Sequence, residues 1–410
     1  MWPTNNRVLQ EHLLHPYLTG NIPGTGGIFK ETPEDFLVTE IPIYTPCGEG
    51  EHIYAEIEKR GITTLEAIRR LAKALGIGER DVGYAGMKDA KGITRQTISL
   101  PRVAPEQVLG LELPGIKVLS AVPHRNKLKV GHLRGNRFRI RIGGVGADAA
   151  TIAIAVLDIL EKRGVPNFFG EQRYGAQGNS HLIGGAILRN DYRGAVDALI
   201  GEPDKVTDER WRRAIEAFKA GDLAKSLETF PPHCRTEREL LQKLVKQPEA
   251  HEKAFRAVHP RLRKLYLSAF QADLFDRVVQ QRMDSLDQVV HGDVAFKHDN
   301  GACFLVTDAA AEAPRAAAFE ISATGPMFGC RMKEPEGETL AMERRLLETE
   351  DLTLPSFDLE GGLRMEGERR PLRVPIAEIG VEADGAGLFL EFSLPKGSYA
   401  TTVLREVMKS

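Results

Sequence analysis

The segment NRFRIRI, residues 136–142, alternates between charged and apolar side chains. Successive residues of an extended chain point to opposite sides, so Phe138 and two isoleucines lie on one face. The other face carries Arg137, Arg139 and Arg141, which we call the arginine face. This period of two residues predicts a β-strand with one side in a hydrophobic core.

The segments before this strand predict more strands and one helix. EDFLVTEIPIY (34–44) and HIYAEIEKR (52–60) also alternate with a period of two. TTLEAIRRLAKALG follows and predicts a helix. Thr63 can cap its first turn, Glu66 lies three residues later as in a capping box, and Gly76 suits the position after the last turn.

The rest of the chain predicts a second body inserted into the first. Residues 147–163 predict a helix that ends at Gly164, and residues 185–283 are predominantly helical in pattern. Short strands with glycine turns follow over 291–330, and then a helix near GETLAMERRLLE. GLFLEFSLPKGSYATTVLREVMK predicts a strand, a turn and a closing helix. We therefore expect an α+β domain that is interrupted by an insertion and completed by the C-terminal segment.

Composition and length narrow the class of protein. The chain has 410 residues, 42% hydrophobic and 27% charged, with a net charge of -2, so any basic surface must be local. Its four cysteines form no Cys-x-x-Cys pair, which disfavours a zinc site and a disulfide framework. No signal-peptide pattern is present, and the apolar run at 151–160 is too short to span a bilayer. We expect a soluble, cytoplasmic protein that does not bind membranes.

Motifs for common cofactors are missing from the sequence. It holds no G-x-G-x-x-G between a strand and a helix, no Walker lysine motif, no H-E-x-x-H, no G-x-S-x-G and no EF-hand loop. These absences leave nucleotide-cofactor, metalloprotease, serine-hydrolase and calcium-binding functions without support, and we expect no metal or organic cofactor.

Basic residues cluster in HRNKLKVGHLRGNRFRIRI, residues 124–142. This stretch has seven lysines and arginines and no acidic residue. The arginine face could follow a phosphate backbone. The alternative is a solvated strand face that pairs with acidic residues elsewhere, and the local charge alone favours this alternative.

A lone carboxylate lies among cations in GYAGMKDAKGITRQ, residues 83–96. Asp89 and Gly92 occupy the first and fourth places of a possible type I turn, which is the simpler explanation. The functional alternative is that the cations Lys88, Lys91 and Arg95 keep Asp89 ionised beside a polyanion. A turn could also present such a carboxylate.

Planar side chains gather among glycines in PNFFGEQRYGAQGNSH, residues 166–181. Phe169 and Arg173 belong to this group. Aromatic and guanidinium planes can stack on unpaired bases, and glycines permit a close approach of the backbone. Taken alone, however, two phenylalanines before a glycine favour a place in the core.

Taken together, these stretches resemble the TruD family of tRNA pseudouridine synthases, which modify uridine 13 of tRNA. The resemblance covers nearly the entire chain and lies in residues 27–42, 48–64, 85–96, 135–142, 168–175, 267–276, 323–329 and 393–406. One departure is visible. The family motif after Lys-Asp is often more basic than the Ala90-Lys91-Gly92 found here, which bears on RNA contacts more than on catalysis.

The resemblance implies a role for several residues. Asp89 matches the catalytic aspartate, Lys30 the active-site basic residue, and Asn136 and Phe138 the family's Asn-x-Phe pair. FFGEQRYG resembles the segment at the edge of the active-site cleft. The implied assignments are then catalysis by Asp89; substrate binding by Lys30, Asn136, Phe138, Phe169, Gln172 and Arg173; and RNA backbone contacts by Lys88, Lys91, Arg95, Arg137, Arg139 and Arg141.

The resemblance also implies an architecture and a partner. A pseudouridine-synthase-type catalytic domain with a mixed, largely antiparallel sheet would comprise residues 1–165 and 369–410. A large inserted α/β domain would comprise residues 166–368. The expected partner is tRNA, no protein partner is required, and a monomer is favoured because nothing resembles a coiled coil.

A solitary carboxylate suits this chemistry. Asp89 would attack the sugar or remove a sugar proton while the base detaches, and the sequence leaves both routes open. Phe138 would stack on the flipped base, although strand alternation places it on an apolar face. Two rivals remain: a non-catalytic RNA-binding or RNA-folding protein on the same scaffold, and a glycosidase or nucleosidase that pairs Asp89 with Glu31, Glu34 or Asp35.

Overall fold

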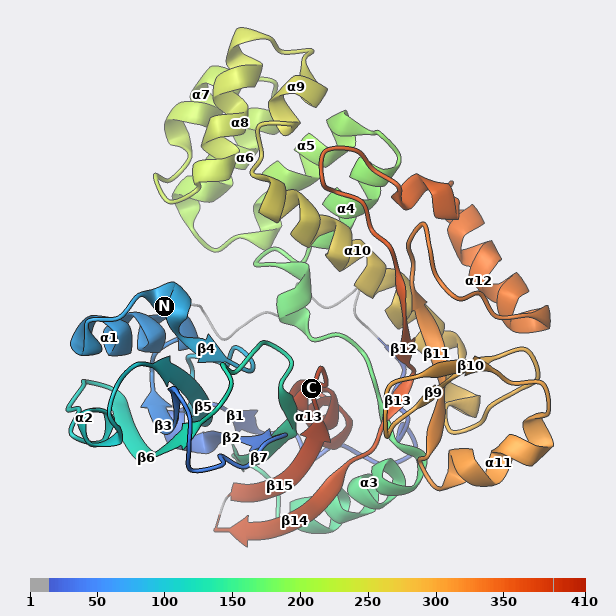
Figure 1. The fold of residues 1–410 in the computed structure, drawn as a ribbon. Helices are drawn as coiled ribbons and strands as arrows, with labels where there is room; N and C mark the ends of the chain where they lie inside the picture. The colour runs from blue at the N-terminus through green and yellow to red at the C-terminus, as the bar shows by residue number, and fades with distance from the viewer. Residues whose placement is uncertain (1–14, 386) are drawn as a thin grey trace. The chain divides into compact units, whose positions relative to one another are not determined.

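The structure, a computed structural model, describes residues 15–385 and 387–410. Contacts divide the chain into two compact units (Figure 1). We call Thr19–Val165 with Val374–Ser410 the host unit, and Pro166–Arg373 with the described residues up to Leu18 the inserted unit. The chain leaves the host unit after residue 165 and returns to it after residue 373, whereas the sequence placed the return after residue 368.

The host unit is built on one large sheet. Its strands lie in the order β14-β15-β7-β2-β5-β3-β6, with β1 beside β7 and β4 beside β5. The pairings are antiparallel except for β2 and β5, which run parallel. This confirms the predicted mixed, largely antiparallel sheet. The strands are β1 (Ile28–Phe29), β2 (Phe36–Pro42), β3 (His52–Arg60), β4 (Gly83–Tyr84), β5 (Ile93–Pro101), β6 (Ile116–His124), β7 (Leu133–Gly143), β14 (Ala377–Asp384) and β15 (Gly387–Pro395).

The central strand β7 has the two faces that its sequence predicts. Phe138 is buried, and Ile140 and Ile142 are fully buried. The antiparallel register places Phe138 beside Val38 of β2 and Phe392 of β15, so these side chains share one side of the sheet. We call this side the apolar face.

Four helices complete the host unit: α1 (Thr64–Leu75), α2 (Pro105–Leu109), α3 (Ala149–Arg163) and α13 (Ala400–Met408). Helix α1 packs on the apolar face of β3 and β5. Its N-cap is as predicted, because the Thr63 hydroxyl accepts a hydrogen bond from the Glu66 N–H at 3.1 Å, and Gly76 takes a left-handed conformation at φ 68°. The Glu66 carboxylate, however, pairs with Arg69 and Arg70.

The inserted unit begins with helices and ends with a small sheet. Its helices are α4 (Ser180–Leu188), α5 (Tyr192–Ile200), α6 (Glu209–Lys219), α7 (Leu223–Thr229), α8 (Arg235–Lys246), α9 (His251–Phe255), α10 (Pro260–Gln281), α11 (Ala309–Ala317) and α12 (Gly337–Thr349). The sheet has the antiparallel order β10-β9-β11-β12, from β9 (Val294–Lys297), β10 (Cys303–Leu305), β11 (Ile321–Met327) and β12 (Glu368–Pro371). The helical stretch and strands β9, β10 and β11 were predicted, whereas β12 and α11 were not.

Helices α4 and α10 approach so closely that a Cβ on Gly184 would lie 2.1 Å from the Tyr266 carbonyl oxygen, so only glycine fits there. At the two chain crossings, β8 (Val165–Pro166) pairs with β13 (Arg373–Val374). Among the helices of the described residues, none is long and apolar enough to cross a membrane.

Candidate active site

Asp89 lies in the host unit, on the loop that joins β4 to β5. Its Oδ2 atom accepts a hydrogen bond from Lys30 Nζ at 2.7 Å, and its Oδ1 atom accepts one from the backbone N–H of Lys91 at 3.0 Å. The side chain remains 27% exposed. The chain bends at residues 90–92, and the carboxylate is presented to solvent at that bend. The expected type I turn over residues 89–92 is not among the hydrogen-bonded turns of the described residues.

Lys30 is held in an uncommon backbone conformation. Its φ angle is 62°, in the left-handed region that a residue with a Cβ enters at a cost of about 1–2 kcal/mol. Such strain is concentrated at functional sites, where the surrounding structure enforces it. The ammonium lies 3.9 Å from the centre of the Phe36 ring, a cation–π contact that directs it towards Asp89.

These contacts keep Asp89 ionised. Burial of the loop would raise the pKa of the carboxyl group, because a low-dielectric environment disfavours its charge. The hydrogen bond and charge of Lys30, with the backbone N–H groups of Lys91 and Ala90, act in the opposite direction and prevail. The pKa of Asp89 therefore lies below its ordinary value, and the group is an available anion near neutral pH.

The charged groups of Lys88 and Arg95 pair with other carboxylates and not with Asp89. Lys88 Nζ lies 3.0 Å from Glu40 Oε2, with side chains only 6% and 2% exposed, and Arg95 pairs with Glu58 at 2.8 Å. The Lys88 contact is an ion pair by distance, although Glu40 Oε2 makes no hydrogen bond of good geometry among the described residues. The buried ion pair with Glu40 weighs against contact between Lys88 and an RNA backbone, which stays a prediction.

Asn136 and Phe138 lie on the apolar face near the lysine–aspartate pair. Phe138 is only 6% exposed, and its ring centre lies 5.4 Å from that of Phe392 and 6.4 Å from that of Phe36, the ring beneath Lys30. These contacts make it a core residue in the free protein, so stacking on a base stays a prediction. Asn136 lies opposite Glu40 in the register of β2 and β7.

The arginine face is paired with acidic residues, as the simpler of the two sequence interpretations expects. Arg139 contacts Glu391 at 2.7 Å and stacks 4.0 Å from the ring centre of Phe389. The other two arginines pair with Glu378 and with Asp384 on β14. Contact between this face and RNA stays a prediction, and the ion pairs weigh against it.

The remaining predicted substrate residues belong to the inserted unit. The guanidinium carbon of Arg370 lies 4.3 Å from the ring centre of Phe169. The backbone N–H of Phe169 donates a hydrogen bond to Asp276. Arg173 donates to Ser268 at 2.5 Å, and Gln172 is exposed. Phe169, Gln172 and Arg173 thus form a local group of their own, and their part in substrate binding stays a prediction.

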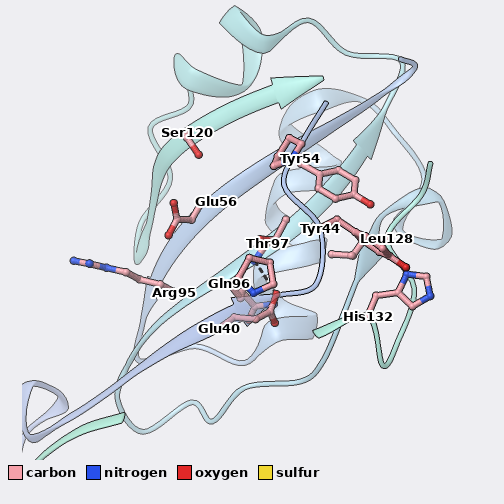
Figure 2. A pocket seen from close by; sticks show the side chains of 12 residues that line it. Glu40, Tyr44, Tyr54, Glu56, Arg95, Gln96, Thr97, Ser120, Leu128 and His132 are labelled. Atoms are coloured by element: carbon pink, nitrogen blue, oxygen red, sulfur yellow. Dashed lines mark hydrogen bonds between the residues drawn. The ribbon is translucent and has the colours of Figure 1, made fainter. Parts of the chain in front are cut away.

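A separate pocket of about 170 Å³ opens on the host sheet where β2 and β5 part after three paired residues (Figure 2). Glu40, Gln96 and Thr97 lie together at one end of it, and the Glu40 carboxylate accepts the Thr97 N–H at 3.3 Å. The remaining lining residues include Tyr44, Tyr54, Glu56, Arg95, Ser120, Leu128 and His132. Glu40 therefore connects this pocket to Lys88, the residue before Asp89.

Two buried charged residues, Lys59 and Glu40, were not predicted from the sequence, although the alternation of buried and exposed positions along their strands indicates them. Lys59 follows Ile53, Ala55 and Ile57 in the buried phase of β3, and Glu40 follows Phe36 and Val38 in that of β2. A charge in the apolar phase of a strand indicates a paired or functional group, because burial of an unpaired charge is costly. Among the described residues, no cluster of histidine, cysteine or acidic side chains could hold a metal ion.

The fold and the site together define a protein that presents an ionised, partly exposed carboxylate on a loop of a mixed sheet. The profile of the family tRNA pseudouridine synthase D (TruD) matches residues 14–407. The tRNA pseudouridine synthase D of Geobacter metallireducens is 69% identical over 393 residues, covering 96% of this chain and 97% of that protein. That of Thermus thermophilus is 39% identical over 402 residues, covering 96% and 92%.

A solved structure of the same family has the same fold. The crystal structure of a TruD protein from Methanosarcina mazei superimposes with a TM-score of 0.83 at 28% identity, and 96% of each chain is covered. The chain therefore belongs to the TruD family of tRNA pseudouridine synthases, which confirms the resemblance inferred from its sequence segments.

Proposed function

We propose that this chain isomerises uridine 13 of tRNA to pseudouridine and that Asp89 is its single catalytic carboxylate. The family supports the reaction class. The observation that carries the assignment to Asp89 is its contact with Lys30, which leaves the carboxylate ionised and partly exposed. We expect the protein to act as a cytoplasmic monomer, as the sequence predicts.

The reaction is an isomerisation that neither gains nor loses atoms. The N1–C1′ bond of uridine breaks, the uracil turns, and a C5–C1′ bond forms. The proton on C5 then leaves and N1 gains one. Asp89 either bonds to the sugar and is later released, or removes and returns a sugar proton. Both routes require an ionised carboxylate, which the Lys30 contact provides.

Two of the three carboxylates that could partner Asp89 in a nucleosidase are engaged elsewhere. A glycosidase needs a second carboxyl group to activate water. Of the candidates, Asp35 accepts the Thr32 N–H at 2.7 Å, and Glu34 pairs with Arg60. Both carboxylates are thus engaged in local contacts of their own.

The test is the Asp89→Asn variant with purified uridine-13 tRNA. We expect pseudouridine formation to fall at least about 100-fold, because the amide cannot act as a base or nucleophile. Binding of tRNA should change by less than about twofold. Asp81→Asn is the matched control, since Asp81 is an exposed aspartate of the same unit, and it should stay active.

Three results would count against the proposal. Wild-type turnover by Asp89→Asn would favour the non-catalytic RNA-binding alternative. Release of free uracil would indicate a nucleosidase. Modification of a tRNA whose uridine 13 has been replaced by cytidine would refute the assigned position.

A further inference from the structure

We infer that Lys59 is a positioning residue that fixes the backbone of the loop carrying Asp89. The inference rests on the proposed function, because it concerns the placement of the carboxylate that performs the reaction.

The ammonium of Lys59 is surrounded by backbone carbonyl groups. Nζ donates to the carbonyl of Asp89 at 2.7 Å, to that of Ile62 at 2.8 Å and, at 3.4 Å, to that of Lys88. Lys59 is 1% exposed, near the end of β3. An ammonium has three N–H donors, and here three carbonyls accept them.

Stability alone does not explain a lysine at this position. Its neighbours in the buried phase of β3 are apolar, and burial of an ion costs several kcal/mol unless its partners compensate. An apolar side chain would avoid this cost but would leave the three carbonyls without the donor that holds them. The carbonyls that Lys59 binds belong to two segments that are far apart in sequence, so the residue ties the start of α1 to the loop at residues 88–89.

A second contact supports the same attachment. The backbone N–H of Lys88 donates to the Thr64 hydroxyl at 2.9 Å, at the first turn of α1. The peptide units on both sides of Lys88 are therefore fixed to the β3–α1 connection. Lys30 then orients the carboxylate of a residue whose backbone is already held. Because reaction rates fall about 100-fold when a reacting group is displaced by about 1 Å, the attachment bears directly on catalysis.

The contacts of Lys59 with the loop should depend on pH, because they depend on the ionisation of its amine. Burial lowers the pKa of Lys59 to about 8, the negative charge of Asp89 raises it, and the positive charge of Lys88 lowers it further. A neutral amine keeps two donors and turns a lone pair towards the third carbonyl. We therefore expect the loop to loosen, and the rate to fall, as the pH rises through about 8.

The same titration acts on stability in the opposite direction. The pKa of Lys59 is lower in the folded protein than in the unfolded chain, so between about 8 and about 10.5 the unfolded state binds more protons. This term makes the fold more stable as the pH rises. A loss of rate caused by deprotonation of Lys59 is therefore not caused by a loss of stability from the same titration, which separates positioning from a general structural role.

The experiment measures single-turnover pseudouridine formation and tRNA affinity against pH for the full-length protein and two variants. Lys59→Met keeps an unbranched apolar side chain one atom shorter than lysine and removes all donors. We expect its rate to fall about 10- to 100-fold with tRNA affinity within about twofold, and the fall in rate near pH 8 to disappear. Hydrogen exchange at residues 88–91 should become faster.

Thr94→Val is the matched control. Thr94 lies opposite Lys59 in the β3–β5 register and is also buried, and its hydroxyl makes no hydrogen bond among the described residues. Its rate should stay within about twofold of wild type. A Lys59→Met protein with the wild-type rate and pH profile would overturn the inference. If that variant does not fold, the wild-type profile decides, because a rate that stays level to about pH 9 overturns it as well.

Failure of the proposed function looks different. In that case Asp89→Asn is active, or the wild-type protein forms no pseudouridine. If only the role of Lys59 is wrong, the wild-type protein is active, Asp89→Asn is inactive, and Lys59→Met is as fast as wild type.

Discussion

Replacement of Lys30 by methionine should make the reaction sensitive to acid. The substitution removes the ammonium that lies 2.7 Å from Asp89 Oδ2 and keeps an apolar stem of similar length against Phe36. Burial of the loop, which favours the protonated carboxyl group, remains in place. The pKa of Asp89 should therefore rise, and the acidic limb of the rate profile should move towards neutral pH.

The size of the effect follows from the contact that is lost. A hydrogen bond to a charged group contributes about 1.5–3 kcal/mol. At about 1.4 kcal/mol per factor of ten, its loss lowers the ratio of ionised to protonated Asp89 by about 10- to 100-fold at a given pH. On the acidic limb the rate should fall by the same factor. Well above the limb, where the carboxyl group is ionised in both proteins, the ionisation effect should vanish.

The assay is release of tritium from C5 of uridine in tRNA, measured in single turnover between about pH 5 and about pH 8. Lys30→Arg is the control, because it keeps a cation in the same backbone conformation and should retain most of the wild-type profile. An equal loss of rate in Lys30→Met at every pH would refute the reasoning. It would show that Lys30 acts on the substrate and not on the ionisation of Asp89.

Three further predictions test other contacts. Glu40→Gln leaves the buried Lys88 ammonium without its counter-charge and should lower the free energy of unfolding in urea by about 3–5 kcal/mol, and a second change of Lys88 to methionine should restore most of the loss. Replacement of the arginine face by glutamines should lower the salt slope of tRNA binding by less than about 0.7 per residue, because each arginine is already paired; a larger drop would show contact with phosphates. Burial raises the pKa of Asp276 to about 8, so between about pH 4 and about pH 8 the folded state holds a proton that the unfolded state has lost, and stability falls as the pH rises. The melting temperature of wild type should therefore fall relative to that of Asp276→Asn between pH 5 and pH 8, and a constant difference would contradict this sign.

Local patterns predicted the elements whose causes are local. The cap at Thr63 and the left-handed Gly76 come from short-range chemistry, so α1 begins and ends where its sequence predicts. The strand β7 has the predicted faces because alternation is a property of the strand itself. The two-unit organisation was predicted with a return to the host near residue 369, and the contacts place this return at residue 374.

What the sequence could not supply was pairing between distant segments. The acids that neutralise the arginine face come from β14 and β15, more than 200 positions later, and only the register of the sheet brings them there. The burial of Lys88 depends on Glu40 of β2 in the same way. Charge density along the chain therefore overestimated the free positive charge, because it counts cations before their partners are known.

Three lysines lie near Asp89, and their different contacts give a physical reason for their number. A carboxylate surrounded by three mobile cations would be ionised but poorly placed, since each could draw it towards a different position. Here the cations have separate tasks: Lys30 binds the carboxylate, Lys59 binds the backbone, and Lys88 is withdrawn to Glu40. One cation sets the charge state and another sets the position, so the two properties can be altered independently. Loss of Lys30 should then move the acidic limb of the rate profile, and loss of Lys59 the alkaline limb. A single variant that moved both limbs would show that the two lysines act as one unit.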